Sequence, residues 1–403
     1  MQRLDPAEAA LVAAIDPAAM LAQVQAWSAI NTGTRNLDGL ARQASLLADA
    51  LSRLPGEVSE HAPENVEAVD GEGRISIIAH GRHLVLTVRP DAPRRVLLTG
   101  HMDTVFSSTD PFQDHKWLDE GTLNGPGVAD MKGGLAVILA ALAAFETSPQ
   151  AAALGYDVMI NSDEETGSLS SAALIAELAR GKHAALTYEP SALPDGTLAG
   201  ERGGSGNFSA VFTGRAAHAG RNPQDGRNAI VAASDFALRL KAAQTSGLPI
   251  NPARIDGGSA NNVVPDHAVL RFNIRPRTIA DAEAFAVLLE TIREGVARDH
   301  NVAIAIHGGI TRPPKPLSPD AERLFGLVRS CGALLGEDIR WQASGGVCDG
   351  NNVAACGVPV VDTMGVRGGA IHSADEFLIV SSLSERAALS ALVLNRIAQG
   401  ALA

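Results

Sequence analysis

The 403-residue sequence has few cysteines and no paired arrangement of them. Its three cysteines, Cys331, Cys348 and Cys356, form no C-x-x-C pair, and an odd, sparse set does not build a disulfide framework. This favours reduced thiols and a cytoplasmic location. The N-terminal segment has an acidic residue, Asp5, near its start and contains no long apolar run. We therefore expect no signal peptide.

Long hydrophobic runs and an excess of basic residues are also missing. The most apolar stretch, 133–145, is too short to span a bilayer and predicts a buried helix. The 33 lysines and arginines are outnumbered by 45 acidic residues, which gives a formal net charge of -12. Nucleic acids and anionic membranes select a basic face, so we expect neither as a partner.

Nucleotide-binding motifs are absent as well. A glycine-rich turn at 125–134 opens an apolar helix. However, it contains no G-x-x-x-x-G-K-[ST] and no G-x-G-x-x-G directly after a strand, so we reject a nucleotide-binding function. We find no internal repeats and no low-complexity segments. Because 403 residues exceed the length at which one core usually stops growing, we expect two domains.

The pattern of apolar residues predicts an α/β fold. Helical spacing over 6–54 predicts an all-helical entry. The β-rich runs between 75 and 88, broken by Gly81, predict a hairpin at the edge of a sheet. Apolar strands and helices then alternate, which predicts a mixed, largely parallel sheet flanked by helices. The later strands are expected at 96–99, 157–161, 184–188 and 358–362.

A second pattern interrupts the first between a glycine-rich segment at 203–206 and a proline-rich one at 312–316. It reads strand, helix, strand, strand, helix, strand, which is the ferredoxin-like order. We therefore predict an inserted α+β domain at 203–314. The catalytic domain would be discontinuous and consist of 1–202 and 315–403.

Ionisable residues follow three of the predicted strands. His101 and Asp103 follow the first strand, the acidic triplet 163–165 follows the second, and Glu189 follows the third. Ligands of open α/β sheets collect at the carboxyl ends of strands. Each stretch alone is typical of a solvated turn, but together they predict a metal site.

Asp130 and His372 extend this set. Asp130 lies in the glycine-rich turn, where a simple helix cap is the alternative interpretation. His372 precedes Ser373-x-x-Glu376, a pattern that predicts a capping box for a helix from Phe377 onward. The imidazole of His372 would add a second nitrogen donor to a ligand set dominated by carboxylates.

Five motifs in this order resemble one zinc-dependent family of hydrolases. They are 98–105, 127–134, 163–167, 188–190 and 372–373. The family includes glutamate carboxypeptidase, acetylornithine deacetylase, succinyl-diaminopimelate desuccinylase and aminoacylase, and the resemblance covers nearly the whole chain. It implies cleavage of an amide bond beside a free carboxylate, as in glutamate carboxypeptidase. N-acyl-amino-acid deacylation is the alternative, and an inactive binding protein of the same fold is a remote one.

The resemblance also implies two divalent metal ions, zinc by preference, with cobalt and manganese as alternatives. Asp130 would bridge the two ions. His101 and Glu189 would complete one site, and Glu165 and His372 the other. Three carboxylates would leave two divalent ions with a net positive charge, which suits the activation of water. A cis peptide bond is expected after Asp130.

Further roles follow from the same resemblance. Glu164 would be the general base, which takes a proton from water and returns it to the leaving amine. Asp103 would orient His101. His218, in the loop 214–220, would donate to the tetrahedral oxyanion. It would do so from the partner subunit of a homodimer formed through the inserted lid domain. A surface-turn histidine is the alternative.

Asn262, Arg275 and Arg312 match the family's substrate-binding positions. A guanidinium suits a free α-carboxylate, so we expect a small N-acyl or peptidyl amino acid as substrate. A strand-end salt bridge is the alternative for Arg275. Cys348 is a candidate nucleophile without a supporting histidine motif. Arg367 would either favour an acidic substrate side chain or be an ordinary surface residue.

Overall fold

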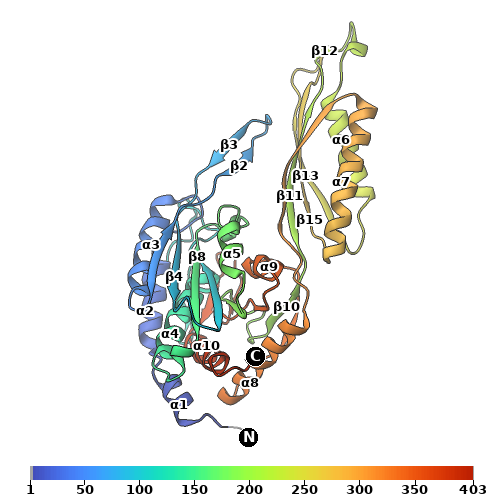
Figure 1. Ribbon diagram of the computed structural model, residues 1–403. Coiled ribbons are helices and arrows are strands. Elements are labelled where there is room, and N and C mark those ends of the chain that lie inside the picture. The colour runs from blue at the N-terminus through green and yellow to red at the C-terminus, as the bar shows by residue number, and fades with distance from the viewer. Residues whose placement is uncertain (1–2, 403) are drawn as a thin grey trace. The chain divides into compact units, whose positions relative to one another are not determined.

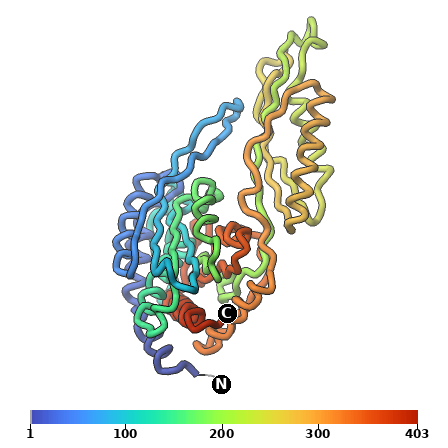
Figure 2. The backbone as a smooth tube through the Cα atoms, in the orientation of Figure 1, coloured from blue at the N-terminus to red at the C-terminus, as the bar shows by residue number. Residues whose placement is uncertain are grey.

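A computed structural model describes residues 3–402 and divides the chain into two compact units. The first unit comprises Met1–Glu64, Ala79–Glu201 and Leu317–Ala403, and the second comprises Asn65–Ile78 and Arg202–Pro316. The blue and red ends of the chain both lie in the first unit (Figure 2). The first unit is therefore assembled from segments far apart in the sequence.

A six-stranded mixed sheet is the framework of the first unit, in the order β1-β4-β8-β5-β9-β18. β1 and β4 run antiparallel to their neighbours, whereas β8, β5, β9 and β18 are parallel to one another. This confirms the expected mixed, largely parallel sheet. The strands are β1 (Glu57–His61), β4 (His83–Val88), β5 (Arg95–His101), β8 (Gly155–Asn161), β9 (Ala184–Thr187) and β18 (Val360–Val361).

Helices cover both faces of this sheet (Figure 1). Val96 and Leu98 of β5 pack into the larger core with α2, α3, α4, α8 and α10. Leu97, between them, packs on the opposite face with α5 and α9, as the alternation of a strand requires. The helices are α1 (Pro6–Ala13), α2 (Pro17–Ser28), α3 (Leu37–Leu51), α4 (Gly134–Glu146), α5 (Ala172–Ala179), α8 (Pro319–Leu335), α9 (Asp349–Ala355) and α10 (Ser382–Ala398).

Helix α4 is the most apolar segment of the chain. Together with the turn before it, Val128–Glu146, it has the length and composition of a membrane span, but 89% of that window is buried inside the fold. It packs against α10, α2 and β5. This confirms the buried helix expected at 133–145.

Two local predictions are wrong. β3 (Ile75–Ile78) pairs with β2 (Val66–Val69) and not with β4, because short runs of similar hydrophobicity do not specify their partner. The hairpin of β2 and β3 belongs to the second unit, whereas β4 is buried between β1 and β8.

The segment after Glu376 is also not a helix. It forms β20 (Phe377–Ile379), which pairs with β7 (Thr122–Asn124) and β19 (Gly368–Gly369), and α10 begins only at Ser382. The hydroxyl of Ser373 donates to the carbonyl of Ala370, so Ser373 and Glu376 form no capping box.

Two smaller sheets accompany the six-stranded one. β6 (Lys116–Asp119) completes a four-stranded sheet in the order β19-β20-β7-β6, and β10 (Leu198–Arg202) pairs with β17 (Trp341–Ser344).

The second unit contains a four-stranded antiparallel sheet in the order β13-β15-β11-β16 with two helices. Both the chain order and the strand order are ferredoxin-like, as expected. The elements are β11 (Ser205–Thr213), α6 (Ala229–Ala242), β13 (Ile250–Gly257), β15 (His267–Ile274), α7 (Ile279–His300) and β16 (Ala303–Arg312), with β12 (Ala217–His218) paired to β14 (Val263–Val264).

The core of the second unit depends on a phenylalanine cluster. Phe272 stacks on Phe208 with 5.1 Å between ring centroids and also contacts Phe236 and Phe285. We predict that Phe272→Ala lowers the free energy of unfolding of this unit by about 3–5 kcal/mol. Val287→Ala, at a position 71% exposed on α7, should change it by less than about 0.5 kcal/mol. Calorimetry that gave equal melting temperatures for the two variants would contradict this packing.

Candidate metal centre

The five predicted ligand side chains converge in the first unit. His101 ends β5, Glu165 lies in the short turn after β8, and Glu189 follows β9. Asp130 comes from the turn Val128–Gly133, and His372 from the loop before β20. Because β5, β8 and β9 are parallel, their carboxyl ends meet at one edge, which is where α/β sheets place ligand sites.

Asp130 lies between two histidines. Its Oδ1 is 3.1 Å from Nε2 of His101, and that nitrogen is 3.7 Å from Oε2 of Glu189. The other oxygen, Oδ2, is 3.2 Å from Nε2 of His372, and the same nitrogen is 3.2 Å from Oε2 of Glu165. The two predicted ligand groups are therefore adjacent and share Asp130.

The protonation of these side chains reflects an excess of buried negative charge. Burial, followed by repulsion from Asp130, raises the pKa of Glu165 to about 8. Burial also raises the pKa of Glu189. Hydrogen bonds to Asp130 and Glu165 raise the pKa of His372 to about 11. Burial opposes the charged form of His101, but the surrounding carboxylates, Glu189 first, hold its pKa well above the usual value.

These donors fit divalent cations. Oε1 of Glu189 is buried without a hydrogen-bond partner, so this carboxylate oxygen is free to act as a metal ligand. Ligand atoms of His101, Asp130 and Glu165 lie within 4.8 Å of one another, and so do those of His101, Glu164 and Glu189. Imidazole and carboxylate donors without a thiolate suit zinc, cobalt or manganese.

Asp103 lies beside His101 and also contacts the acidic turn. Nδ1 of His101 is 3.0 Å from the carbonyl oxygen of Asp103 and 3.4 Å from its Oδ1. The Asp103 carboxylate accepts hydrogen bonds from the backbone N–H groups of Glu164 and Glu165, at 3.1 and 3.3 Å, and from Thr34 at 2.7 Å. A single buried carboxylate thus orients the histidine and both glutamates.

Glu376 is a supporting residue that the sequence interpretation missed. Its carboxylate accepts hydrogen bonds from the backbone N–H groups of Gly127, Ala129 and Asp130, at 3.2, 2.9 and 3.0 Å. Burial, with Asp130 nearby, raises the pKa of Glu376 to about 7. The peptide bond between Asp130 and Met131 is cis, as the family resemblance implied.

Lys132 is the second supporting residue that was missed. Its ammonium donates to the backbone carbonyls of Trp27 and Ile30, at 3.0 and 2.8 Å, and burial lowers its pKa to about 7. These bonds tie the Asp130 turn to the end of α2. A lysine two residues after Asp130, between the glycine-rich turn and the apolar helix α4, is the sequence signal that could have indicated such a role.

Three other residues considered in the sequence analysis lie in the first unit outside the proposed ligand set. Asp163, the first acid of the triplet, accepts from the backbone and hydroxyl of Ser170 and from the hydroxyl of Ser171. Arg367 pairs with Glu385 at 3.0 Å and donates to a backbone carbonyl. Cys348 is 3% exposed at the start of α9.

The remaining predicted residues all lie in the second unit. His218 is exposed on β12, and its Nδ1 accepts from the backbone of Gly220 at 3.0 Å. The exposed Asn262 adjoins it, because its carbonyl accepts from the backbone of Ala219. Arg275 is exposed and donates to the side chain of Asn273, with no salt bridge to any residue among 3–402. Arg312 is 2% exposed.

The ligand group formed by Asp130, Glu165 and His372 is tested by replacing His372. We predict that His372→Ala lowers the metal content to about one ion per chain, since one of two sites loses its only nitrogen donor. His61→Ala, which removes a histidine from β1, should leave the content unchanged. Elemental analysis of both purified proteins measures the ratio, and equal contents would remove His372 from the ligand set.

Comparison with known proteins agrees with this arrangement. The model of peptidase family M20/M25/M40 matches residues 97–396, which is more than half of the chain. Carboxypeptidase G2 of Pseudomonas sp. (strain RS-16) is 28% identical over 386 residues, covering 92% of this chain and 87% of that protein. The succinyl-diaminopimelate desuccinylase of Psychrobacter arcticus is 28% identical over 326 residues, covering 75% and 78%.

A solved structure has the same fold. The YXEP protein of Bacillus subtilis, described as a dinuclear metal binding peptidase from the M20 family, superposes with a TM-score of 0.64 at 14% identity. The superposition covers 95% of this chain and 98% of that one. At this identity the likeness concerns the fold.

Proposed function

The chain belongs to peptidase family M20/M25/M40, and we propose that it is a dimetal hydrolase that cleaves an amide bond adjacent to a free carboxylate. The observation that carries the proposal is the position of Asp130, with His101 on one oxygen and His372 on the other. The relation to carboxypeptidase G2 over 92% of the chain makes a carboxypeptidase of the glutamate type the first candidate.

In this proposal, His101, Asp130 and Glu189 hold one divalent ion, and Asp130, Glu165 and His372 hold the other. Zinc is the preferred ion, with cobalt and manganese as alternatives. Ions bound there would lower the pKa of water and polarise the carbonyl group of the substrate. The buried carboxylates supply the negative charge that would hold the ions in place. The YXEP protein, described as a dinuclear metal binding peptidase, supports a site for two metal ions.

Glu164 acts as the general base. Its carboxylate lies within 4.8 Å of ligand atoms of His101 and Glu189, and its backbone N–H is held by Asp103 at 3.1 Å. The Glu164 carboxylate accepts the proton of the attacking water and later returns it to the leaving nitrogen. Glu165, the next residue, remains a ligand, so the two neighbouring glutamates have separate tasks.

The second unit contributes to substrate binding in the proposal. The insert, 203–314, serves as a lid and dimerisation domain, and His218 donates a hydrogen bond to the oxyanion that develops on the substrate bound in the partner subunit of a homodimer. The exposed His218 and Asn262 are accessible for this purpose. Of the two arginines, the exposed Arg275 is better suited than the buried Arg312 to meet a substrate carboxylate. Three free cysteines fit a reducing cytoplasm.

N-acyl-amino-acid deacylation is the second candidate function. The desuccinylase relative supports it, and the chemistry is the same, because an amide beside a carboxylate is cleaved in either case. A binding protein without activity is a remote alternative, which the complete ligand set and Glu164 disfavour. A panel of dipeptides, N-acylglutamates and N-acetylated basic amino acids separates these functions by relative kcat/KM.

Recognition of the free substrate carboxylate is tested by converting that carboxylate to an amide. For the best substrate of that panel, we predict that amidation of the α-carboxylate lowers kcat/KM by about 10- to 100-fold, the equivalent of one lost charge-assisted hydrogen bond. The free and amidated forms are assayed on the same metal-loaded protein. Equal values would contradict recognition of the carboxylate.

The general base is tested by Glu164→Gln. We predict a loss of kcat of about 10²- to 10⁴-fold with full metal content, since the amide keeps the shape but cannot take a proton. Glu177→Gln, at an exposed position on α5, is the control and should keep full activity. If Glu164→Gln loses a metal ion, Glu164 is a ligand and the division of roles is wrong.

A further inference from the structure

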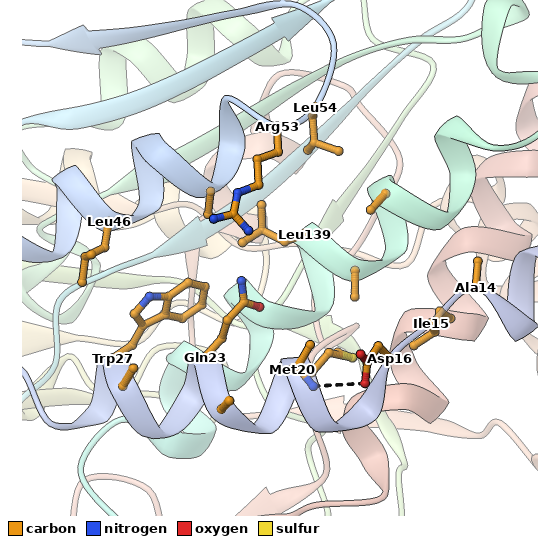
Figure 3. A pocket seen from close by; sticks show the side chains of 16 residues that line it. Ala14, Ile15, Asp16, Met20, Gln23, Trp27, Leu46, Arg53, Leu54 and Leu139 are labelled. Atoms are coloured by element: carbon orange, nitrogen blue, oxygen red, sulfur yellow. Dashed lines mark hydrogen bonds between the residues drawn. The ribbon is translucent and has the colours of Figure 1, made fainter.

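A cavity of about 630 Å³ lies among α2, α3 and α4 of the first unit (Figure 3). Its volume falls within the range of small-molecule sites, roughly 300–1,000 Å³. None of the proposed metal ligands lines it, and neither does Glu164. The cavity is therefore separate from the proposed active site, and its role does not depend on the hydrolase function.

Small residues create the cavity. Ala19, Ala22 and Ala26 recur on the cavity side of α2, and α4 presents Ala140 and Ala143. Alanine has a single methyl group as its side chain, so it fills little of the space at each of these positions. Larger apolar side chains, which include Met20, Trp27 and Leu139, are buried in the wall. The result is a concave apolar groove.

Two polar side chains without a protein partner line this groove, the exposed Arg53 and the partly exposed Gln23. Figure 3 shows the side chain of Arg53 reaching from beyond the end of α3 toward Gln23 of α2, beside the ring of Trp27. Within residues 3–402, the side chains of Arg53 and Gln23 make no hydrogen bond or ion pair. The acidic lining residue, Asp16, already caps α2 by accepting from two backbone N–H groups. Arg53 is therefore the charged lining side chain whose hydrogen-bond donors are all free for a ligand.

We propose that this groove binds a small amphipathic monoanion, a carboxylate with an aliphatic or aromatic tail. The tail occupies the space between the alanines of α2 and α4, where it loses contact with water. The carboxylate pairs with the guanidinium of Arg53 and accepts a hydrogen bond from the amide of Gln23, and both are interactions suited to a carboxylate. Apolar walls with a few convergent polar groups are typical of ligand sites.

The rim of the groove disfavours a macromolecular partner. Leu46, 42% exposed, is the most accessible of its large apolar lining residues, and the aromatic lining residue, Trp27, is buried, whereas protein interfaces are enriched in accessible aromatic anchors. An anionic membrane surface is recognised by clusters of basic residues, and Arg53 is the one cationic side chain among the described lining residues. A small ligand with a single negative charge matches this groove better than a protein surface or a membrane does.

Calorimetric titration of sodium octanoate into the full-length, metal-loaded protein tests the proposal. We expect one-to-one binding that is about 15-fold tighter than that of hexanoate, since each buried methylene contributes about fourfold. Octylamine, with the same tail and the opposite charge, should not bind. Quenching of the tryptophan fluorescence, to which Trp27 contributes, should follow the same isotherm.

Two pairs of variants locate the binding. Arg53→Gln should weaken octanoate binding by about tenfold or more, whereas Arg42→Gln, an exposed arginine on α3 outside the groove, should not. Ala143→Leu should narrow the groove and weaken binding, whereas Ala18→Leu, exposed on α2 and outside the lining, should have no effect. Glu164→Gln should bind octanoate as the unmodified protein does, which keeps this test independent of the hydrolase function.

Four results would overturn the proposal. They are absence of binding, equal binding of octylamine, octanoate binding that survives Arg53→Gln, and a change of oligomeric state in Ala143→Leu. The third would place the carboxylate at the metal centre. The last, measured by light scattering, would identify the groove as a contact between two copies of the chain.

Discussion

The structure of the first unit depends on a cluster of negative charge buried around Asp130. Asp130, Glu165 and Glu189 lie together at the carboxyl ends of parallel strands, and each is less than one-fifth exposed in its side chain. Buried carboxylates are costly unless a positive charge compensates them. The raised pKa of Glu165, about 8, is the sign of that cost. In the proposed metal centre, two divalent cations held by the surrounding nitrogen and oxygen donors would supply that positive charge.

The backbone around this cluster is fixed by polar side chains that touch no substrate in the proposed reaction. Asp103 holds His101 and the turn of the two glutamates. Glu376 holds the Asp130 turn through three N–H groups, and Lys132 ties the same turn to α2. Such contacts restrict the ligands to one geometry, which metal centres require. The sheet places the ligand residues at one edge, and these hydrogen bonds fix the orientation of their backbone and side chains.

Much of this arrangement could be predicted from the sequence, because strand ends are visible as apolar runs that stop at polar residues. His101, the 163–165 triplet and Glu189 each follow such a run, and parallel strands bring them to one edge. Glu376 could not be found in this way. Its partners are 246 to 249 residues away, whereas Ser373-x-x-Glu376 is a local pattern that resembles a cap. The pairing of β3 with β2 was missed for a similar reason, since short strands do not identify their partners.

In the proposed metal centre, two cations share Asp130. The most direct measurement is anomalous diffraction at the zinc absorption edge from crystals of the zinc-loaded protein. We expect two peaks roughly 3.5–4 Å apart. One should lie beside His101 and Glu189 and the other beside His372 and Glu165, with an oxygen of Asp130 directed at each. A single peak, or two peaks that do not both contact Asp130, would contradict it.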